Sequence, residues 1–283
     1  MIKHRSLLLT IGTHVILVLW LFIMLFPIYL ALATSSHNEQ SLLHAPIPLS
    51  FGHHFLQNYK LVLFHGLNAL GGIPVWVMLK NSLIMALLIA FGKIIVSIFA
   101  AYAIVYFRFP LRMFFFWLIF MTLMLPVEVR IVPTFQVVAE FHLIDSYWGL
   151  SLPLIASATA TFLFRQFFRT IPSELLEAAR VDGAGPLRFF LDILLPLSRT
   201  NIAALFIIMF LYGWNQYLWP LLATTTGDMS TIVMGMQRLA NIADQIPQWN
   251  YIMATAILAL LPPVVIIIVL QKLFVRGLID SEK

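Results

Sequence analysis

The sequence has no cysteine and few charged residues, and each shortage excludes a class of protein. Without cysteine, the chain can form neither disulfides nor thiolate metal sites, and it has no cysteine nucleophile. Only 10% of its 283 residues are charged, whereas 61% are hydrophobic, and the mean hydropathy is +0.95. A soluble globular domain carries about 25% charged residues. The composition therefore predicts an all-α polytopic membrane protein.

Six apolar runs are long enough to cross a bilayer, because one helical crossing needs about 20 residues. The first run is longer than the apolar core of a cleaved signal peptide, which is roughly 7 to 15 residues, so we interpret it as a retained span. One transmembrane domain over 1–283 accounts for the length and leaves no room for a soluble catalytic domain. The six predicted spans are 11–33, 82–107, 113–132, 148–168, 202–222 and 252–270.

The basic residues gather at the ends of these runs. If both termini lie in the cytoplasm, twelve of the seventeen lysines and arginines fall inside and four at or near the outer face, while Lys93 lies within a span. This distribution fits the positive-inside rule. Membrane topology therefore explains the basic residues better than nucleic-acid binding does, and no nucleic-acid partner is expected.

Two polar segments stand out between the spans. In the predicted topology, residues 34–77 form a periplasmic loop and residues 169–200 form a cytoplasmic loop. The periplasmic loop contains five histidines, but no pair has helical i, i+4 spacing and no carboxylate cluster accompanies them. Exposed loop histidines are therefore favoured over a metal site. The five are His37, His44, His53, His54 and His65.

The cytoplasmic loop has the pattern of a helix, a turn and a second helix. Ser173 is a good N-cap, and Glu174 and Glu177 suit the positive end of the helix dipole. Gly183 supplies a left-handed stop, and a second short helix is expected after Pro186. Helices this short are marginal alone in water. The loop is therefore either a docking element for a partner or an amphipathic connector on the lipid surface.

The same loop carries a family signature. Glu177-Ala178-Ala179, followed by Gly183 and later by Ile193 and Leu195-Pro196, resembles the EAA motif of permease subunits of bacterial ATP-binding-cassette importers. In that family the loop forms coupling helices that sit in a cleft of the ATPase subunit. The resemblance implies a type I importer permease fold with six transmembrane helices. It also implies an ATPase-coupling role for Glu177, Ala178, Ala179, Asp182 and Gly183.

The resemblance extends over nearly the whole chain. With segments such as FRFPLR, TLMLPVEVRI and YGWNQYLWPLL, the sequence is similar to the permease subunits of bacterial sn-glycerol-3-phosphate importers. This implies ATP-driven import from periplasm to cytoplasm by alternating access in the bacterial inner membrane, with glycerophosphodiesters as further candidate substrates. The implied partners are two ATPase subunits, a second homologous permease, a periplasmic solute-binding protein and membrane lipid. ATP and Mg would be used by the ATPase subunits. This chain would then hold no cofactor, metal or catalytic residue and would not be an enzyme.

Polar residues within the spans are candidates for the substrate pathway, because burying them in a membrane is costly. Lys93 could contact an anionic substrate, pair with a carboxylate of a partner subunit, or snorkel to the cytoplasmic interface. The last two interpretations, taken together, are favoured over the first. Arg130 is the better candidate for a phosphate, because a guanidinium offers paired donors; a helix-end salt bridge with Glu128 is the alternative. Asn215 and Gln216 could hold a substrate hydroxyl or serve helix packing.

Two other functions stay open at this point. The chain could import a neutral sugar or oligosaccharide. It could also be an integral-membrane enzyme acting on lipids, although this would need a His and carboxylate cluster or an HExxH motif, and the sequence has neither. An ion channel is disfavoured because there is no pore loop or charged ring.

Overall fold

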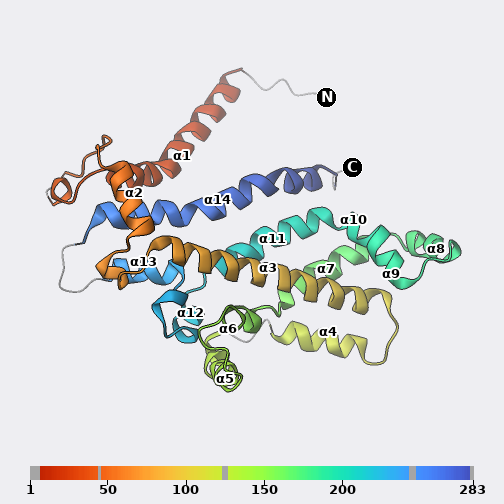
Figure 1. The fold of residues 1–283 in the computed structure, drawn as a ribbon. Helices are drawn as coiled ribbons and strands as arrows, with labels where there is room; N and C mark the ends of the chain where they lie inside the picture. Colours follow the sequence, from red (N-terminus) through yellow and green to blue (C-terminus); the bar gives the residue numbers. More distant parts are fainter. Residues whose placement is uncertain (1–6, 44–45, 123–126, 242–246, 281–283) are drawn as a thin grey trace. The chain divides into compact units, whose positions relative to one another are not determined.

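The fold is helical throughout the part of the chain that the computed structural model describes, residues 7–43, 46–122, 127–241 and 247–280 (Figure 1). Two compact units divide the chain, and each is described by itself. The first consists of Met1–Trp76 and Gly235–Leu260, and the second of Val77–Met234 and Leu261–Lys283.

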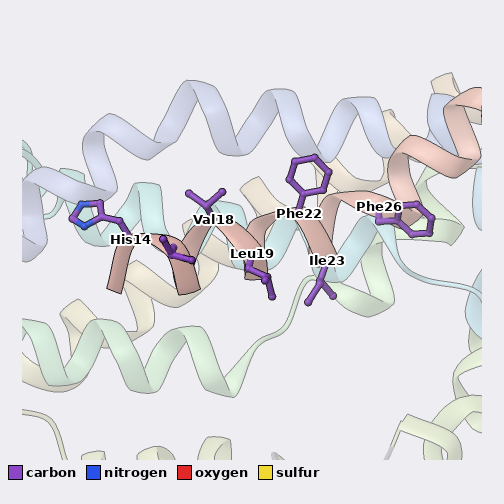
Figure 2. A pocket seen from close by; sticks show the side chains of 7 residues that line it. His14, Val18, Leu19, Phe22, Ile23 and Phe26 are labelled. Carbon is purple, nitrogen blue, oxygen red and sulfur yellow. The ribbon is translucent and has the colours of Figure 1, made fainter. Parts of the chain in front are cut away.

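The first unit begins with the long helix α1, Leu7–Thr34. Its apolar side chains are exposed along most of its length, as expected for a helix that faces lipid or a partner in the membrane. A hollow of about 750 Å³ lies along this helix. Figure 2 shows the side chains that line it. The hollow is lined by His14, Val15, Val18, Leu19, Phe22, Ile23 and Phe26.

The predicted periplasmic loop folds around helix α2, Phe55–Phe64. The buried Asn58 of α2 donates from its side-chain amide to the carbonyls of Ser35 and His37, at 2.8 Å each. The ring of His37 contacts the carbonyl of Ser50 at 2.9 Å. These bonds fasten the chain after α1 to α2. Short 3-10 turns lie on either side of α2, η1 at Gln40–Leu42 and η2 at Asn68–Leu70.

Most of the remaining helices lie in the second unit. It is built on α3, Val75–Tyr106, and it ends in α14, Trp249–Asp280, which begins in the first unit. Between them come α4 (Arg112–Met121), α5 (Val127–Glu140), α6 (Tyr147–Ser151), η4 (Leu152–Leu154), α7 (Ala158–Thr170), α8 (Ser173–Val181), α9 (Pro186–Phe189), the π-helical turn η5 (Phe190–Leu194), α10 (Leu195–Leu197), α11 (Arg199–Trp214), α12 (Leu218–Ala223), η6 (Gly227–Met229) and α13 (Ile232–Ala240).

The predicted first, second and sixth spans are confirmed as helices long and apolar enough to cross a membrane. They are Ile11–Thr34, Val75–Tyr106 and Trp249–Gln271, so the second begins earlier than the predicted residue 82. Two bent helix pairs bring the count in the described residues to as many as five, with bends of 51° at residues 155–157 and 72° at Ser198. Six spans with cytoplasmic termini stay a prediction.

The fourth and fifth predicted spans are not continuous helices, and the fourth is bent at residues 155–157. Of the third, α4 covers the residues up to Met121 and α5 those from Val127, and residues 123–126 lie outside the described part. The fifth ends at Trp214 and resumes at Leu218. Pro220 explains this interruption, because it has no N–H to donate and its ring clashes with the carbonyl four residues earlier, that of Gln216.

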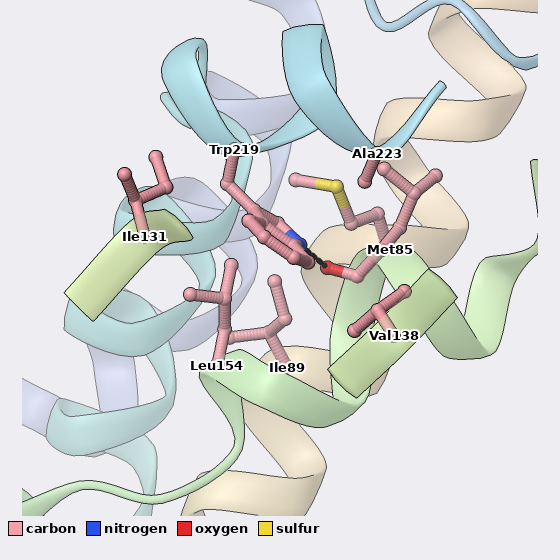
Figure 3. Packing of buried hydrophobic residues seen from close by; sticks show 8 residues of the cluster. Met85, Ile89, Ile131, Val138, Leu154, Trp219 and Ala223 are labelled. Carbon is pink, nitrogen blue, oxygen red and sulfur yellow. Dashed lines mark hydrogen bonds between the residues drawn. The ribbon is translucent and has the colours of Figure 1, made fainter. Parts of the chain in front are cut away.

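A buried cluster joins α3, α5, α6 and α12 (Figure 3). At its centre lies Trp219, whose indole N–H is shared between the carbonyls of Gly149 and Leu150, at 3.2 Å each. The bond satisfies the polar atom of a side chain that is only 2% exposed. The apolar side chains around it are Met85, Ile89, Ile131, Val138, Leu150, Leu154 and Ala223.

Two glycines allow α3 to approach its neighbours closely. A Cβ at Gly213 of α11 would lie 2.9 Å from the Cα of Ala86, and a Cβ at Gly92 would lie 2.6 Å from a side-chain carbon of Ile155. Small residues of this kind let helices pack in a membrane, where no hydrophobic force drives them together. The contact at Gly213 fixes the neighbouring Tyr212 against α3.

Candidate functional site

The predicted coupling helix is present as α8, with one correction at its start. Its N-cap is Pro172 rather than Ser173, and no side chain caps it, so Ser173 is the first helical residue. The C-terminal prediction is confirmed: Gly183 has φ +73°, and the Ala184 N–H donates to the Ala179 carbonyl at 2.8 Å. This is the Schellman arrangement, which satisfies carbonyls at the helix end.

The five predicted ATPase-coupling residues divide into two sets by exposure. Ala179 is buried at 4% exposure and packs α8 onto the rest of the unit. The other four, Glu177, Ala178, Asp182 and Gly183, are exposed. Next to them Val181 is 87% exposed, which leaves an apolar side chain without cover within this chain. Four of the five predicted residues are thus available to another protein.

The second part of the loop fastens this surface to α3. The predicted short helix after Pro186 is confirmed as α9, which continues into the turn η5. Tyr102 of α3 donates from its hydroxyl to the Pro186 carbonyl at 2.8 Å, and the Phe190 ring stacks on Phe99. Figure 1 shows α9 beside the last part of α3, with α8 next to it. These contacts fasten α9 and η5, which follow α8 in the chain, to α3.

The substrate-pathway candidates Lys93 and Arg130 come from different helices, and their charges interact. Lys93 of α3 is 5% exposed, and its ammonium lies 3.6 Å from the ring centroid of Tyr212, a cation–π contact. The charge of Arg130, on α5, acts on both Lys93 and Tyr212. No carboxylate of the described residues lies within 4 Å of the Lys93 ammonium. A snorkelling lysine would expose its ammonium, so this burial disfavours that interpretation.

The remaining candidates have distinct surroundings. Arg130 is exposed and borders a cavity of about 40 Å³ that also touches Trp219. The side chain of Glu128, its proposed salt-bridge partner, lies outside the described part. Gln216 donates from its side chain to the Tyr212 carbonyl at 3.1 Å, while Asn215 is exposed in the break between α11 and α12.

Sequence reasoning missed two residues of this region. Tyr212 belongs to the aromatic segment YGWNQYLWPLL, and nothing local in the sequence indicates that its ring meets Lys93. Asp145 was not singled out at all. It has φ +57°, which is unusual for a residue other than glycine, and its N–H donates to the Ala223 carbonyl at 3.1 Å.

Asp145 joins the loop before α6 to the loop after α12. Its carboxylate accepts bonds from the N–H of Thr225 at 2.7 Å and of Thr226 at 3.0 Å, and from both threonine hydroxyls. Partial burial acts to raise the pKa of Asp145, but these four hydrogen bonds to the charged form outweigh it, and the net pKa is lowered. The folded state therefore favours the ionised carboxylate.

We expect Asp145→Asn to lower the stability of the protein by about 0.5 to 1 kcal/mol at neutral pH, a small value because solvent screens an exposed site. Since the folded pKa lies below its ordinary value of 3.8, the stabilisation is present above that pH and is lost as the pH falls through the folded pKa. Thermal unfolding of the reconstituted protein measured against pH tests this. Asp228→Asn is the control, and equal acid sensitivity in wild type and Asp145→Asn contradicts the expectation.

Comparison with known proteins gives consistent matches over most of the chain. Residues 93–280 match the family described as binding-protein-dependent transport system inner membrane component. An sn-glycerol-3-phosphate transport system permease protein of Brucella melitensis is 54% identical over 283 residues, 100% of each chain. The permease protein of the same name from Yersinia pestis is 56% identical over 275 residues, 97% of this chain and 98% of the relative.

A solved structure shows the same fold. It belongs to a bacterial ABC transporter involved in the import of the acidic polysaccharide alginate, and it aligns with a TM-score of 0.78 over 96% of this chain and 98% of that chain. The sequence identity is 18%, so this likeness concerns the fold alone. It confirms the predicted importer permease fold.

Proposed function

Since the chain belongs to the family of inner membrane components of binding-protein-dependent transport systems, we propose that it carries sn-glycerol-3-phosphate across the inner membrane. The observation that carries the substrate assignment is the 54% identity over the full length of a permease named for this substrate. As a transport subunit the chain is not an enzyme. It works with an ATPase and a binding protein, as its family does.

The proposed complex contains two ATPase subunits, this permease and a second homologous permease, and a periplasmic solute-binding protein delivers the substrate. ATP and Mg are used by the ATPase subunits, and this chain holds no cofactor. The exposed residues Glu177, Ala178, Asp182 and Gly183 dock into the ATPase, with Ala179 packing beneath them. The exposed Val181 supports this assignment, because an interface with a partner would cover it.

The proposed mechanism is alternating access driven from α8. Closure of the ATPase subunits on ATP moves α8, and the bond from Tyr102 to Pro186 carries the movement to α3. Lys93 lies on α3, so the same movement changes its position relative to Tyr212 of α11. Hydrolysis then resets the cycle. The chain acts as a two-state element whose balance is set by nucleotide bound elsewhere.

The proposed substrate region is the neighbourhood of Lys93, Arg130 and Tyr212. Lys93 and Arg130 are both cations, and no carboxylate of the described residues lies within 4 Å of Lys93. A phosphate would neutralise their positive charge, whereas a neutral sugar would leave it uncompensated. Asn215 and Gln216 lie at the adjoining break and offer donors and acceptors for the glycerol hydroxyls. Glycerophosphodiesters present the same phosphate and are further candidate substrates.

The test is the ATPase activity of the reconstituted complex with its binding protein, measured with glycerol-3-phosphate, glycerophosphocholine, maltose and no ligand. Stimulation by glycerophosphates alone is the expected result. Stimulation by maltose instead would retain the coupling role and remove the proposed substrate. No stimulation by any ligand would contradict the importer assignment itself.

A further inference from the structure

A basic cleft lies between the end of α3, the start of α4, the end of α7 and the α8 to α9 turn. Its volume is about 910 Å³. Four arginines and one glutamate are the charged residues that line it: Arg108, Arg112, Arg169, Arg180 and Glu177. All of these elements belong to the second unit. The cleft therefore carries a strong net positive charge next to the coupling helix.

The arginines are not neutralised by carboxylates of the described residues. Among the described residues neither Arg112 nor Arg169 lies within 4 Å of one, and Arg112 donates to the Phe107 carbonyl at 3.5 Å. The charges of both act unfavourably on Arg165, whose guanidinium lies 4.0 Å from the Phe116 ring centroid. The positive-inside rule explains why basic residues lie at the cytoplasmic membrane interface, but it does not explain why four arginines line one cleft. An anion in the cleft would relieve this repulsion.

The walls of the cleft are aromatic. The hydroxyls of Tyr102 and Tyr106 donate to the carbonyls of Pro186 and Phe168, at 2.8 and 3.4 Å, so these polar atoms are used within the protein. Their rings and that of Phe189 remain as an apolar lining. The cleft thus offers guanidinium groups for an anion and an apolar wall for the carbon atoms attached to it.

An apolar surface leads away from the cleft along α4. This helix begins at Arg112, and its side chains include Phe114, Trp117 and Leu118, which are 58%, 54% and 49% exposed. Apolar side chains with this exposure suit contact with acyl chains. A molecule with its anion at Arg112 can therefore extend its apolar part along α4.

We propose that this cleft binds the headgroup of an anionic glycerophospholipid, such as phosphatidylglycerol, from the leaflet on the side of α8. The phosphate lies at Arg112 and Arg169, and the acyl chains follow α4. Basic pockets between membrane helices are suited to such headgroups. Because Leu176 and Ala179 of α8 also line the cleft, the lipid braces the coupling helix against α3 and α7. This site is independent of which substrate is transported.

The test uses the whole importer complex, purified and placed in nanodiscs of phosphatidylcholine with or without phosphatidylglycerol. Native mass spectrometry measures the phosphatidylglycerol retained by wild type, by Arg112→Gln with Arg169→Gln, and by Arg188→Gln with Arg199→Gln. The last pair is the matched control, because it removes two exposed arginines of the same loop that do not line the cleft. Arg112→Lys with Arg169→Lys keeps both positive charges, so this variant separates the loss of charge from a general loss of folding.

Affinity for phosphatidylglycerol is expected to fall about thirtyfold in the cleft Gln pair, the change that two arginines at about 1 kcal/mol each produce. The control pair and the Lys pair are expected to keep most of the lipid.

The proposal is overturned if the cleft Gln pair retains as much phosphatidylglycerol as wild type. It is also overturned if the control pair loses as much phosphatidylglycerol as the cleft Gln pair. If the cleft Gln pair loses binding of inorganic phosphate but retains as much lipid as wild type, the cleft binds a free anion and the lipid proposal is overturned. Loss of the ATPase subunit with lipid retention unchanged would assign the cleft to that protein.

Discussion

Replacing Gly183 with valine is expected to reduce ATP-coupled uptake at least tenfold while membrane insertion stays normal. Gly183 has φ +73°, and a left-handed backbone costs a residue with a Cβ about 1 to 2 kcal/mol, more for a β-branched one. A Cβ at this position meets no atom within 4 Å, so the expected loss comes from the backbone and not from crowding within this chain. The strained turn would displace α8 from its docking position. Uptake of labelled substrate by vesicles or cells measures the effect.

Asparagine at the same position is the matched control. Asn tolerates the left-handed region better than other residues with a side chain, so Gly183→Asn is expected to keep more transport than Gly183→Val. The amount of permease and of co-purified ATPase is measured for each variant. Normal uptake in Gly183→Val, with normal amounts of the complex, would remove the docking role from this turn.

The coupling loop could be predicted from the sequence because its signals are local. A proline, two glutamates in the first turns and a glycine at the end define α8 within about ten residues, and all but the N-cap position are confirmed. The N-cap differs because Pro172 already provides the non-helical residue before the helix. Local rules thus describe the loop well, although its tertiary fastening to α3 through Tyr102 carries no local signal.

The breaks within the apolar runs were not predicted, because hydropathy cannot distinguish a continuous helix from two helices joined at an angle. Residues 202–222 contain no charged residue and therefore suggest a single span. Pro220 was the available signal, because it precludes the bond to the Gln216 carbonyl that a continuous helix would require. The break matters for the proposed function, because it places Asn215 and Gln216 at a helix end instead of on a helix face.

The candidate pathway shows the same limit for tertiary contacts. Lys93 and Arg130 are each recognisable in the sequence as charges in an apolar setting, but only the structure shows that Lys93 contacts the Tyr212 ring and that the charge of Arg130 acts on both. The bonds from Thr225 and Thr226 to Asp145 link residues 80 and 81 positions apart. Such pairings depend on how the helices pack, and a single sequence holds no record of that packing.

Replacing Lys93 with methionine is expected to lower the maximal rate of glycerol-3-phosphate transport about tenfold or more, because a charge-assisted contact contributes about 1.5 to 3 kcal/mol. Methionine has a similar length and fills the same space on α3. Lys93 is 5% exposed, with no carboxylate of the described residues within 4 Å of its ammonium, so removal of the charge is also expected to raise the thermal stability of the complex. Transport loss with a stability gain distinguishes a functional charge from a structural one.

Lys93→Arg is the control for this prediction, because it keeps the charge and the cation–π contact with Tyr212. It is expected to retain more transport than Lys93→Met, and Arg130→Gln is expected to resemble Lys93→Met if both cations face the phosphate. Transport rates and unfolding temperatures are measured on the same preparations. Wild-type transport in Lys93→Met would leave Lys93 as a packing residue held by Tyr212, and a matched fall in rate and stability would give it a structural role only.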